Sequence, residues 1–300
     1  MPRPPALVAL LVFSLAATAT RAHASNRHHG LNISIDSDER VTSCDQLRVR
    51  SDREIARGEE RLTLPGNAGH FKAAQNGGIF VYGSDRKDIL VLTCKVGVSE
   101  EQTSAERMLQ MIKTSSQGGE LTVEGPEDGD WTAYLIIQAP RDSQLSLRAL
   151  NGPISVADLA GKVEVHNTNG PLSIKNSPGE ISAQITNGPI SYAGGGGDVR
   201  LRAENGPIDV RLAGTSWSGK GLDAESTNGP LALKIPTDYL SGVLVQTRGY
   251  SPFHCSGCDT AHKDFDDTNK SVQFGTGPTL VRLSTVNGPV SINDNDNDKE

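Results

Sequence analysis

Apolar and polar residues alternate along most of this chain, and in its middle the alternation repeats with a fixed period. Between Gly152 and Val210 a five-residue unit recurs every nine residues, with Gly first and apolar residues at its third and fifth positions. The copies are Gly152–Val156, Gly161–Val165, Gly170–Ile174, Gly179–Ala183, Gly188–Tyr192, Gly197–Leu201 and Gly206–Val210. A fixed period of this kind is typical of repeat architectures, in which each unit buries its apolar face against its neighbours.

Every second copy is preceded by Asn and has Pro after its Gly, so the structural period is 18 residues, made of two similar halves. Successive side chains of a strand point to opposite faces, so Ile154 and Val156 point one way and Ser155 the other. The spacings of three and four that a helix requires are missing. Asn-Gly also forms antiparallel hairpin turns, but the likeness of successive 18-residue units favours a parallel stack. The pattern predicts an all-β fold, a single parallel β-solenoid of about 18-residue coils.

The corners of the predicted coil carry Asn-Gly-Pro at Asn151, Asn169, Asn187 and Asn205, and the triplet returns at Asn228 and Asn287. Gly suits a corner that needs a positive φ, and Pro suits the first residue of a strand. These Asn side chains are expected to form a column. The column either hydrogen-bonds along the stack or offers amides to a sugar polymer, and we favour the first because the turn already explains Asn.

Alternating segments extend the predicted solenoid over residues 31–292. One stretch, 99–113, has helical spacing instead. Ser99 to Gln102 reads as a capping box, and Ala105, Met108, Leu109 and Ile112 share one helical face. We therefore expect one inserted or capping helix near 99–113. A second exception, 249–270, reads as a long loop.

The two ends of the chain read differently from the middle. Arg3, the apolar run Ala6–Ala19 and Ala22-His-Ala24 have the plan of a secretory signal peptide over 1–24, with a short membrane anchor as the alternative. We expect a flexible lead over 25–30 and a disordered acidic tail over 293–300. The mature chain is predicted to lack a transmembrane span and to be exported, whether periplasmic, outer-membrane-associated or extracellular.

Composition and charge narrow the function classes. The formal net charge of −7 argues against a nucleic-acid partner and against an anionic membrane surface. An aromatic content of 4% with 32 Gly is low for a globular enzyme and natural for a thin stack of strands.

The four cysteines fit an exported, disulfide-containing chain. The simplest pairing is Cys44 with Cys94 and Cys255 with Cys258, although the sequence does not determine connectivity. His254, Cys255, Cys258 and His262 could instead hold zinc, and the close thiols could exchange disulfides, but closure of the loop is favoured. The acidic residues from Asp294 to Glu300 only faintly resemble a calcium loop and lack its Gly. We expect no metal and no cofactor.

The Asn-Gly-Pro repeats and the lead-in segment Ile136–Leu145 make the chain similar to the DUF4097 family of bacterial β-strand-repeat proteins, which are related to adhesin-like head domains. The resemblance covers roughly residues 31 to 292. It implies a β-solenoid fold and a location in the cell envelope or at the surface, and it supplies no catalytic residues. The chain departs from the commoner pattern by having Pro after Asn-Gly.

Outward-facing side chains are the remaining candidates for function. One face should carry a column of Ser155, Ser173, Ser191 and Asp209, and the other a column of Glu164, Ser182 and Arg200. Hydrolysis of a polysaccharide needs two carboxylates held together, and Glu164 and Asp209 lie on different coils. We therefore predict an exported, non-catalytic, adhesin-like protein that binds an envelope polysaccharide or an envelope protein. The alternatives are a structural or envelope-stress scaffold for a protein partner and, less favoured, a polysaccharide-active enzyme. No catalytic, cofactor or metal residue is assigned, and the ligand-binding residues are unknown.

Overall fold

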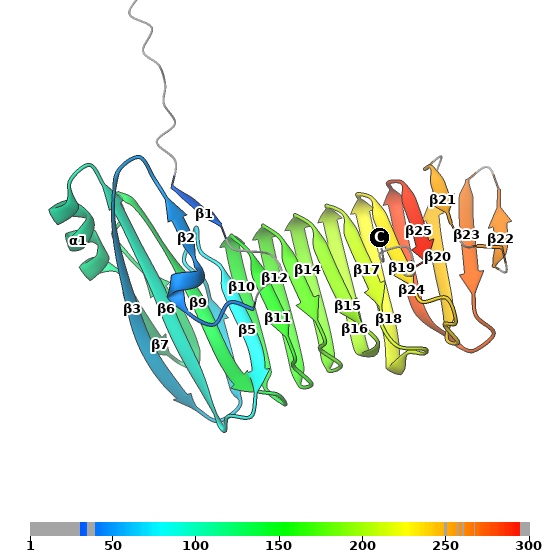
Figure 1. Ribbon diagram of the computed structural model, residues 1–300, viewed down its shortest axis with the longest axis horizontal. Helices are drawn as coiled ribbons and strands as arrows, with labels where there is room; N and C mark the ends of the chain where they lie inside the picture. Colours follow the sequence, from blue (N-terminus) through cyan, green and yellow to red (C-terminus); the bar gives the residue numbers. More distant parts are fainter. Residues whose placement is uncertain are drawn as a thin grey trace, which may run out of the picture.

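A computed structural model describes residues 31–34, 40–248, 251–256, 258–259, 261–266 and 268–294. The predicted signal peptide, the flexible lead and residues 295–300 lie outside the described residues. What is described is almost entirely strand, arranged as two large sheets that face each other across one core (Figure 1). The all-β prediction is confirmed. No helix among the described residues is both long enough and apolar enough to cross a membrane.

The first large sheet, called sheet I, contains twelve strands. From one edge to the other they are β22 (His262–Phe265), β23 (Asn269–Phe274), β20 (Gly242–Arg248), β24 (Thr279–Asn287), β18 (Ser218–Asn228), β16 (Gly196–Asn205), β14 (Glu180–Asn187), β12 (Lys162–Asn169), β10 (Gln144–Asn151), β4 (Ala68–Lys72), β8 (Glu120–Glu124) and β7 (Lys113–Gln117).

The second large sheet, sheet II, contains eleven strands and lies opposite the first. In order they are β21 (Phe253–Cys255), β25 (Val290–Asp294), β19 (Leu231–Ile235), β17 (Ile208–Leu212), β15 (Ile190–Gly194), β13 (Leu172–Lys175), β11 (Ile154–Ala157), β5 (Ile79–Ser84), β9 (Asp130–Pro140), β6 (Asp88–Ser99) and β3 (Glu54–Pro65). A separate antiparallel pair joins β1 (Asn32–Ser34) to β2 (Arg48–Arg50), with a short 3-10 helix, η1 (Cys44–Gln46), before β2.

From β10 to β19 the chain alternates between the sheets, and each strand is parallel to the next strand of its own sheet (Figure 1). Residues 18 apart are partners: Val163 lies beside Ile181 in sheet I, and Leu172 beside Ile190 in sheet II. Inward residues such as Ile154, Val156, Val163 and Val165 are at most 1% exposed. The 18-residue period of the sequence is therefore the number of residues that separates register partners on neighbouring strands of one sheet.

The glycine column at the Asn-Gly corner has a different cause from the one expected. Only Gly170 and Gly188 have a positive φ there, of 148° and 147°. What the whole column shares is close stacking. A Cβ at Gly206 would lie 2.0 Å from the carbonyl oxygen of Gly188, and one at Gly229 would lie 2.1 Å from that of Gly206. Backbone atoms of successive corners thus touch, and a side chain does not fit between them.

The prediction of a single parallel β-solenoid over 31–292 is not confirmed, because both sheets are mixed and neither closes on itself. At one end β3, β6 and β9 run antiparallel, as do β7 and β8. At the other end β20, β23 and β22 do the same. The order of strands also departs from the sequence, since β24 and β25 lie between β18–β19 and β20–β21. The last strands of the chain therefore do not close the stack.

The single α-helix described, α1 (Gln102–Met111), lies at the end of the molecule marked by β3 and β6 (Figure 1). Its inward residue Ala105 is fully buried, and Gly97 of β6 leaves room for it, because a Cβ there would meet the Ala105 carbonyl oxygen at 2.8 Å. The capping box expected at Ser99 is wrong. Ser99 ends β6, and Glu101 is the N-cap without a side-chain hydrogen bond. The helix is a cap on the core, shorter than the predicted 99–113.

Much of the described part of 249–270 is strand, where a loop was expected. The region holds β21, β22 and the start of β23, and Cys258 is 2% exposed within the main core. The first two residues of the predicted tail, 293 and 294, belong to β25 instead. A repeat stack needs polar caps at its ends, and β20–β23 form the cap opposite α1.

An N-terminal strap, residues 40–50, covers part of the outer face of sheet II. Val41 and Leu47 are buried against Phe80, Tyr134 and Ile136 in a second, smaller core. A disulfide joins Cys44 of the strap to Cys94 of β6, with their Cα atoms 5.3 Å apart. The disulfide confirms the predicted pairing of Cys44 with Cys94. The strap explains why the outward positions of β5, β6 and β9 are apolar, because it buries them.

Candidate binding groove

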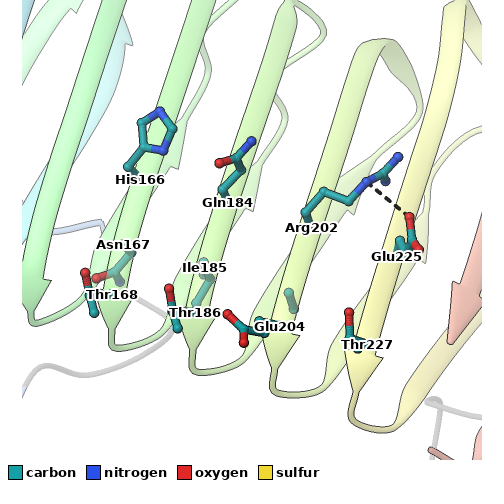
Figure 2. Close-up of a pocket in the computed structure, with 11 residues that line it drawn as sticks. His166, Asn167, Thr168, Gln184, Ile185, Thr186, Arg202, Glu204, Glu225 and Thr227 are labelled. Carbon is teal, nitrogen blue, oxygen red and sulfur yellow. Dashed lines mark ion pairs between the residues drawn. The ribbon is translucent and has the colours of Figure 1, made fainter. Parts of the chain in front are cut away.

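One candidate site is a polar groove on the outer face of sheet I, crossing β12, β14, β16 and β18 (Figure 2). Its volume is about 450 Å³. It is lined by His166, Asn167, Thr168, Gln184, Ile185, Thr186, Arg202, Ala203, Glu204, Glu225 and Thr227.

Register explains why these side chains come together. His166 is the partner of Gln184, Gln184 of Arg202, and Arg202 of Glu225, so the four form one row across four strands. Two residues further along each strand the outward positions form a second row, Thr168, Thr186, Glu204 and Thr227. Successive positions in a row are separated by the strand spacing of about 4.8 Å.

The charged groups of the groove are held in place by their neighbours. The Arg202 guanidinium lies 2.9 Å from the Asp223 carboxylate and 3.3 Å from the Glu225 carboxylate, both on β18. The hydrogen bond to Asp223 is the main cause that raises the pKa of Arg202. His166 lies 3.0 Å from Glu164, and this contact lowers the pKa of the Glu164 carboxyl. The groove thus presents ordered amide, hydroxyl and charged groups rather than a lone reactive group.

The groove continues in both directions along the stack. A hollow of about 960 Å³ shares His166 and Thr168 with it and extends to Lys72 on β4. A hollow of about 520 Å³ shares Glu225 and extends to Gln246 on β20. From β4 to β20 the continuous surface crosses eight strands, a length of about 30 Å at the usual strand spacing.

The outward columns predicted from the sequence are confirmed by the register. Ser155, Ser173, Ser191 and Asp209 are successive partners on sheet II. Glu164, Ser182 and Arg200 are successive partners on sheet I. The sheet I column borders the groove, but none of its three members is among the groove's lining residues. On sheet II, Ser155, Ser173 and Ser191 line a separate hollow of about 800 Å³. The sequence reading missed the row that does line it, although Arg148, His166, Gln184 and Arg202 recur at the same 18-residue interval.

The asparagine column is a hydrogen-bonded ladder. The Asn169 amide nitrogen donates to the Asn151 oxygen at 2.9 Å, and Asn187 donates to Asn169 at 2.9 Å. The ladder continues through Asn205, Asn228 and Asn287 and ends on Asn76. The amides are used along the stack, which supports the structural role over a row of free sugar ligands.

The other candidate chemistry does not come together. Cys255 and Cys258 are paired with each other, their Cα atoms 5.8 Å apart, and His254 and His262 lie on different sheets. Within the described part of the chain no three His, Cys, Asp or Glu side chains are placed to share a metal ion. The acidic residues beyond Asp294 lie outside the described residues.

No protein-family model matches the chain, and no curated protein matches it. Among solved structures, a "putative cell adhesion protein" from Clostridium sporogenes is 12% identical, covering 80% of this chain and 100% of its own, with a TM-score of 0.32. A "putative adhesin" from Bacteroides fragilis is 8% identical, covering 80% and 97%, with a TM-score of 0.30. A "putative lipid binding protein" from Parabacteroides distasonis is 10% identical, covering 81% and 98%, with a TM-score of 0.27. Similarity at this level assigns neither a family nor a ligand to this chain.

Proposed function

We propose that this protein is an exported, non-catalytic, adhesin-like β-solenoid that binds a linear polysaccharide of the bacterial cell envelope along the outer face of sheet I. The observation that carries the proposal is the continuous groove from β4 to β20, because its length suits an extended polymer better than a small molecule. Membership of the DUF4097 family and a signal peptide over 1–24 belong to the same proposal.

The chemistry of the groove supports a sugar ligand. Thr168, Thr186 and Thr227 offer hydroxyls, and Gln184 offers an amide, at a regular spacing along the stack. Hydroxyls and amides both donate and accept hydrogen bonds, as sugar hydroxyls require. A rigid parallel sheet also holds these groups in place before binding, which lowers the entropy cost of association.

Export is supported by the disulfide between Cys44 and Cys94, since structural disulfides persist in oxidising compartments. A non-catalytic role is supported by the state of the groove carboxylates. Glu225 is bound to Arg202, and Glu204 is the only other carboxylate lining the groove of Figure 2.

The test is saturable binding of purified linear envelope polysaccharides to the purified protein and to two matched variants. Thr186→Tyr places a large side chain in the groove and should weaken binding by roughly tenfold or more, which corresponds to about 1.4 kcal/mol. Ala232→Tyr places the same side chain on the outer face of β19 in sheet II and should leave binding unchanged. Tyr is well tolerated in strands, so both variants should fold.

Equal binding by the two variants would contradict the proposal. So would saturable binding of a purified envelope protein, with no polysaccharide bound, and that result would favour the scaffold alternative.

A further inference from the structure

One end of the groove carries a row of basic side chains. Lys72 on β4 is the register partner of Arg148 on β10, and Arg148 is the partner of His166 on β12. Lys72 and Arg148 are exposed on the outer face of sheet I, and all three line the same hollow of about 960 Å³. Two permanent cations therefore stand side by side at the separation of neighbouring strands.

Elsewhere on this sheet, charged side chains of neighbouring strands form ion pairs. Lys162 lies 2.9 Å from Glu180, and Arg202 lies 2.9 Å from Asp223. Where two acidic side chains are partners, at Glu180 and Asp198, cations pair with both.

Those compensating cations are Lys162 for Glu180, and Arg200 and Lys220 for Asp198. Neither Lys72 nor Arg148 makes an ion pair with any carboxylate among the described residues. Like charges placed directly opposite each other destabilise a sheet, so the pairing of Lys72 with Arg148 costs stability, although the Arg148 charge lies near enough to the Glu164 carboxyl to help lower the pKa of that group.

The hollow around this pair has further features of a sugar site. The Trp131 indole nitrogen donates to the Pro126 carbonyl oxygen at 2.9 Å, which fixes the ring, and Leu150 is 44% exposed beside it. Asn76 also lines the hollow and is the last member of the amide ladder. Its side-chain oxygen accepts from Asn151 at 3.1 Å, and its own amide N–H groups have no acceptor within the described part of the chain.

We infer that this end of the groove is a subsite for an acidic sugar, and that the bound polymer is a polysaccharide carrying uronic acid carboxylates. The inference rests on the proposed function. A carboxylate bridges Lys72 and Arg148 in charge-assisted hydrogen bonds, and the apolar face of the sugar ring packs against Trp131 and Leu150.

The remaining charges of the hollow agree with this orientation. Glu124, at the end of β8, and Glu127, in the connection to β9, also line it. They repel a carboxylate and accept hydrogen bonds from sugar hydroxyls, so they direct the acidic group toward Lys72 and Arg148.

The probes are polygalacturonate and its fully methyl-esterified form, which share one backbone and differ in the charge of the carboxyl group. The purified protein should bind polygalacturonate at least tenfold more tightly than the ester, and the preference should shrink as salt is added. The Lys72→Gln/Arg148→Gln variant should lose that preference. The Lys87→Gln/Lys175→Gln variant removes two exposed cations elsewhere, from the β5–β6 turn and from β13, and should keep it. Arg148→Lys retains the charge and should retain most of the preference.

Three outcomes would overturn the subsite. The first is equal binding of the two polymers. The second is a preference that survives in Lys72→Gln/Arg148→Gln, and the third is the same loss in the Lys87→Gln/Lys175→Gln control. If Thr186→Tyr still weakens polymer binding in those cases, the groove proposal stands and only the acidic subsite fails. If neither polymer binds, the subsite is wrong, and the groove is then judged by the other envelope polysaccharides.

Discussion

Replacing Gly206 with Ala should disrupt the stack at one corner. The glycine column runs through Gly152, Gly170, Gly188, Gly206, Gly229 and Gly288. An added Cβ at any of them would lie between 1.9 and 2.3 Å from a carbonyl oxygen of the preceding corner. At Gly206 the nearest atoms belong to the backbone of Gly188, at 2.0, 2.6 and 3.2 Å. Backbone atoms cannot rotate away, so the two corners must separate by about 1 Å to remove the overlap.

The cost follows from the bonds that cross this corner. The Gly188 amide donates to the Asn205 carbonyl oxygen at 3.0 Å, and the Ile190 amide donates to the Pro207 carbonyl oxygen at 2.9 Å. The Asn205 side chain donates to Asn187 at 3.2 Å. A separation of about 1 Å takes these bonds outside hydrogen-bonding range, and a net value of about 1 kcal/mol each gives a destabilisation of about 3 kcal/mol.

Urea unfolding followed by circular dichroism measures this difference in the free energy of unfolding. Gly66→Ala is the control, because Gly66 has a φ of +84° and no atom within 4 Å of an added Cβ. Gly66→Ala should lower the free energy of unfolding only by the cost of holding Ala in a left-handed backbone conformation, about 1 kcal/mol. Comparison of m-values will show whether the array still unfolds as one unit. If Gly206→Ala lowers the free energy of unfolding no more than Gly66→Ala does, close stacking of the corners does not explain the glycine column.

Two further predictions concern polar contacts. Asn187→Ala removes two ladder bonds and should cost about 1–2 kcal/mol, about twice the cost of Asn287→Ala, for which one ladder bond is recorded; equal costs in urea unfolding would show that the ladder contributes little. Burial raises the pKa of the Glu60 carboxyl, but the Lys95 ammonium and the Thr114 hydroxyl outweigh this and hold it below its ordinary value of 4.5. A lowered pKa in the folded state stabilises the protein above the unfolded value, and this contribution disappears as the pH falls through the folded value. The Glu60→Gln variant should therefore lose less stability than the wild type on acidification below pH 4.5; identical acid profiles for the two proteins would contradict the assignment.

The stacked middle of the molecule was predictable because one constraint sets it. A coil of fixed length places residue i beside residue i+18, so partners such as Ser173 and Ser191 follow from counting. The ends were not predictable in this way, because alternation of apolar and polar residues is the same in parallel and antiparallel strands. Val281 on β24 pairs with Leu222 on β18 and also with Val243 on β20. These inward residues are of similar size. No local feature of the sequence indicates that β24 and β25 insert between earlier strands.

The groove escaped the sequence reading because the two halves of a coil are unequal. The repeated unit ends at Val165, but β12 continues to Asn169 and has eight residues, whereas β13 has four. The extra length needs a further inward position after Val165, and Asn167 supplies it. Asn167 is 4% exposed, and its amide donates to the carbonyl oxygens of Gly152 and Gly170 at 3.0 and 3.1 Å.

The corresponding positions show how this extension is built. Ser226 and Thr285 use their hydroxyls in the same way, donating to Gly206 and Gly229, each at 2.9 Å. Ile185 and Ala203 occupy the same inward position on β14 and β16, so the strands of sheet I run on for four residues with either a polar or an apolar side chain there. That extension adds the outward positions of His166 and Thr168, which line the groove. The greater strand length of sheet I thus adds a second row of outward positions to its groove, whereas on sheet II the column of Ser155, Ser173 and Ser191 lines a separate hollow of about 800 Å³.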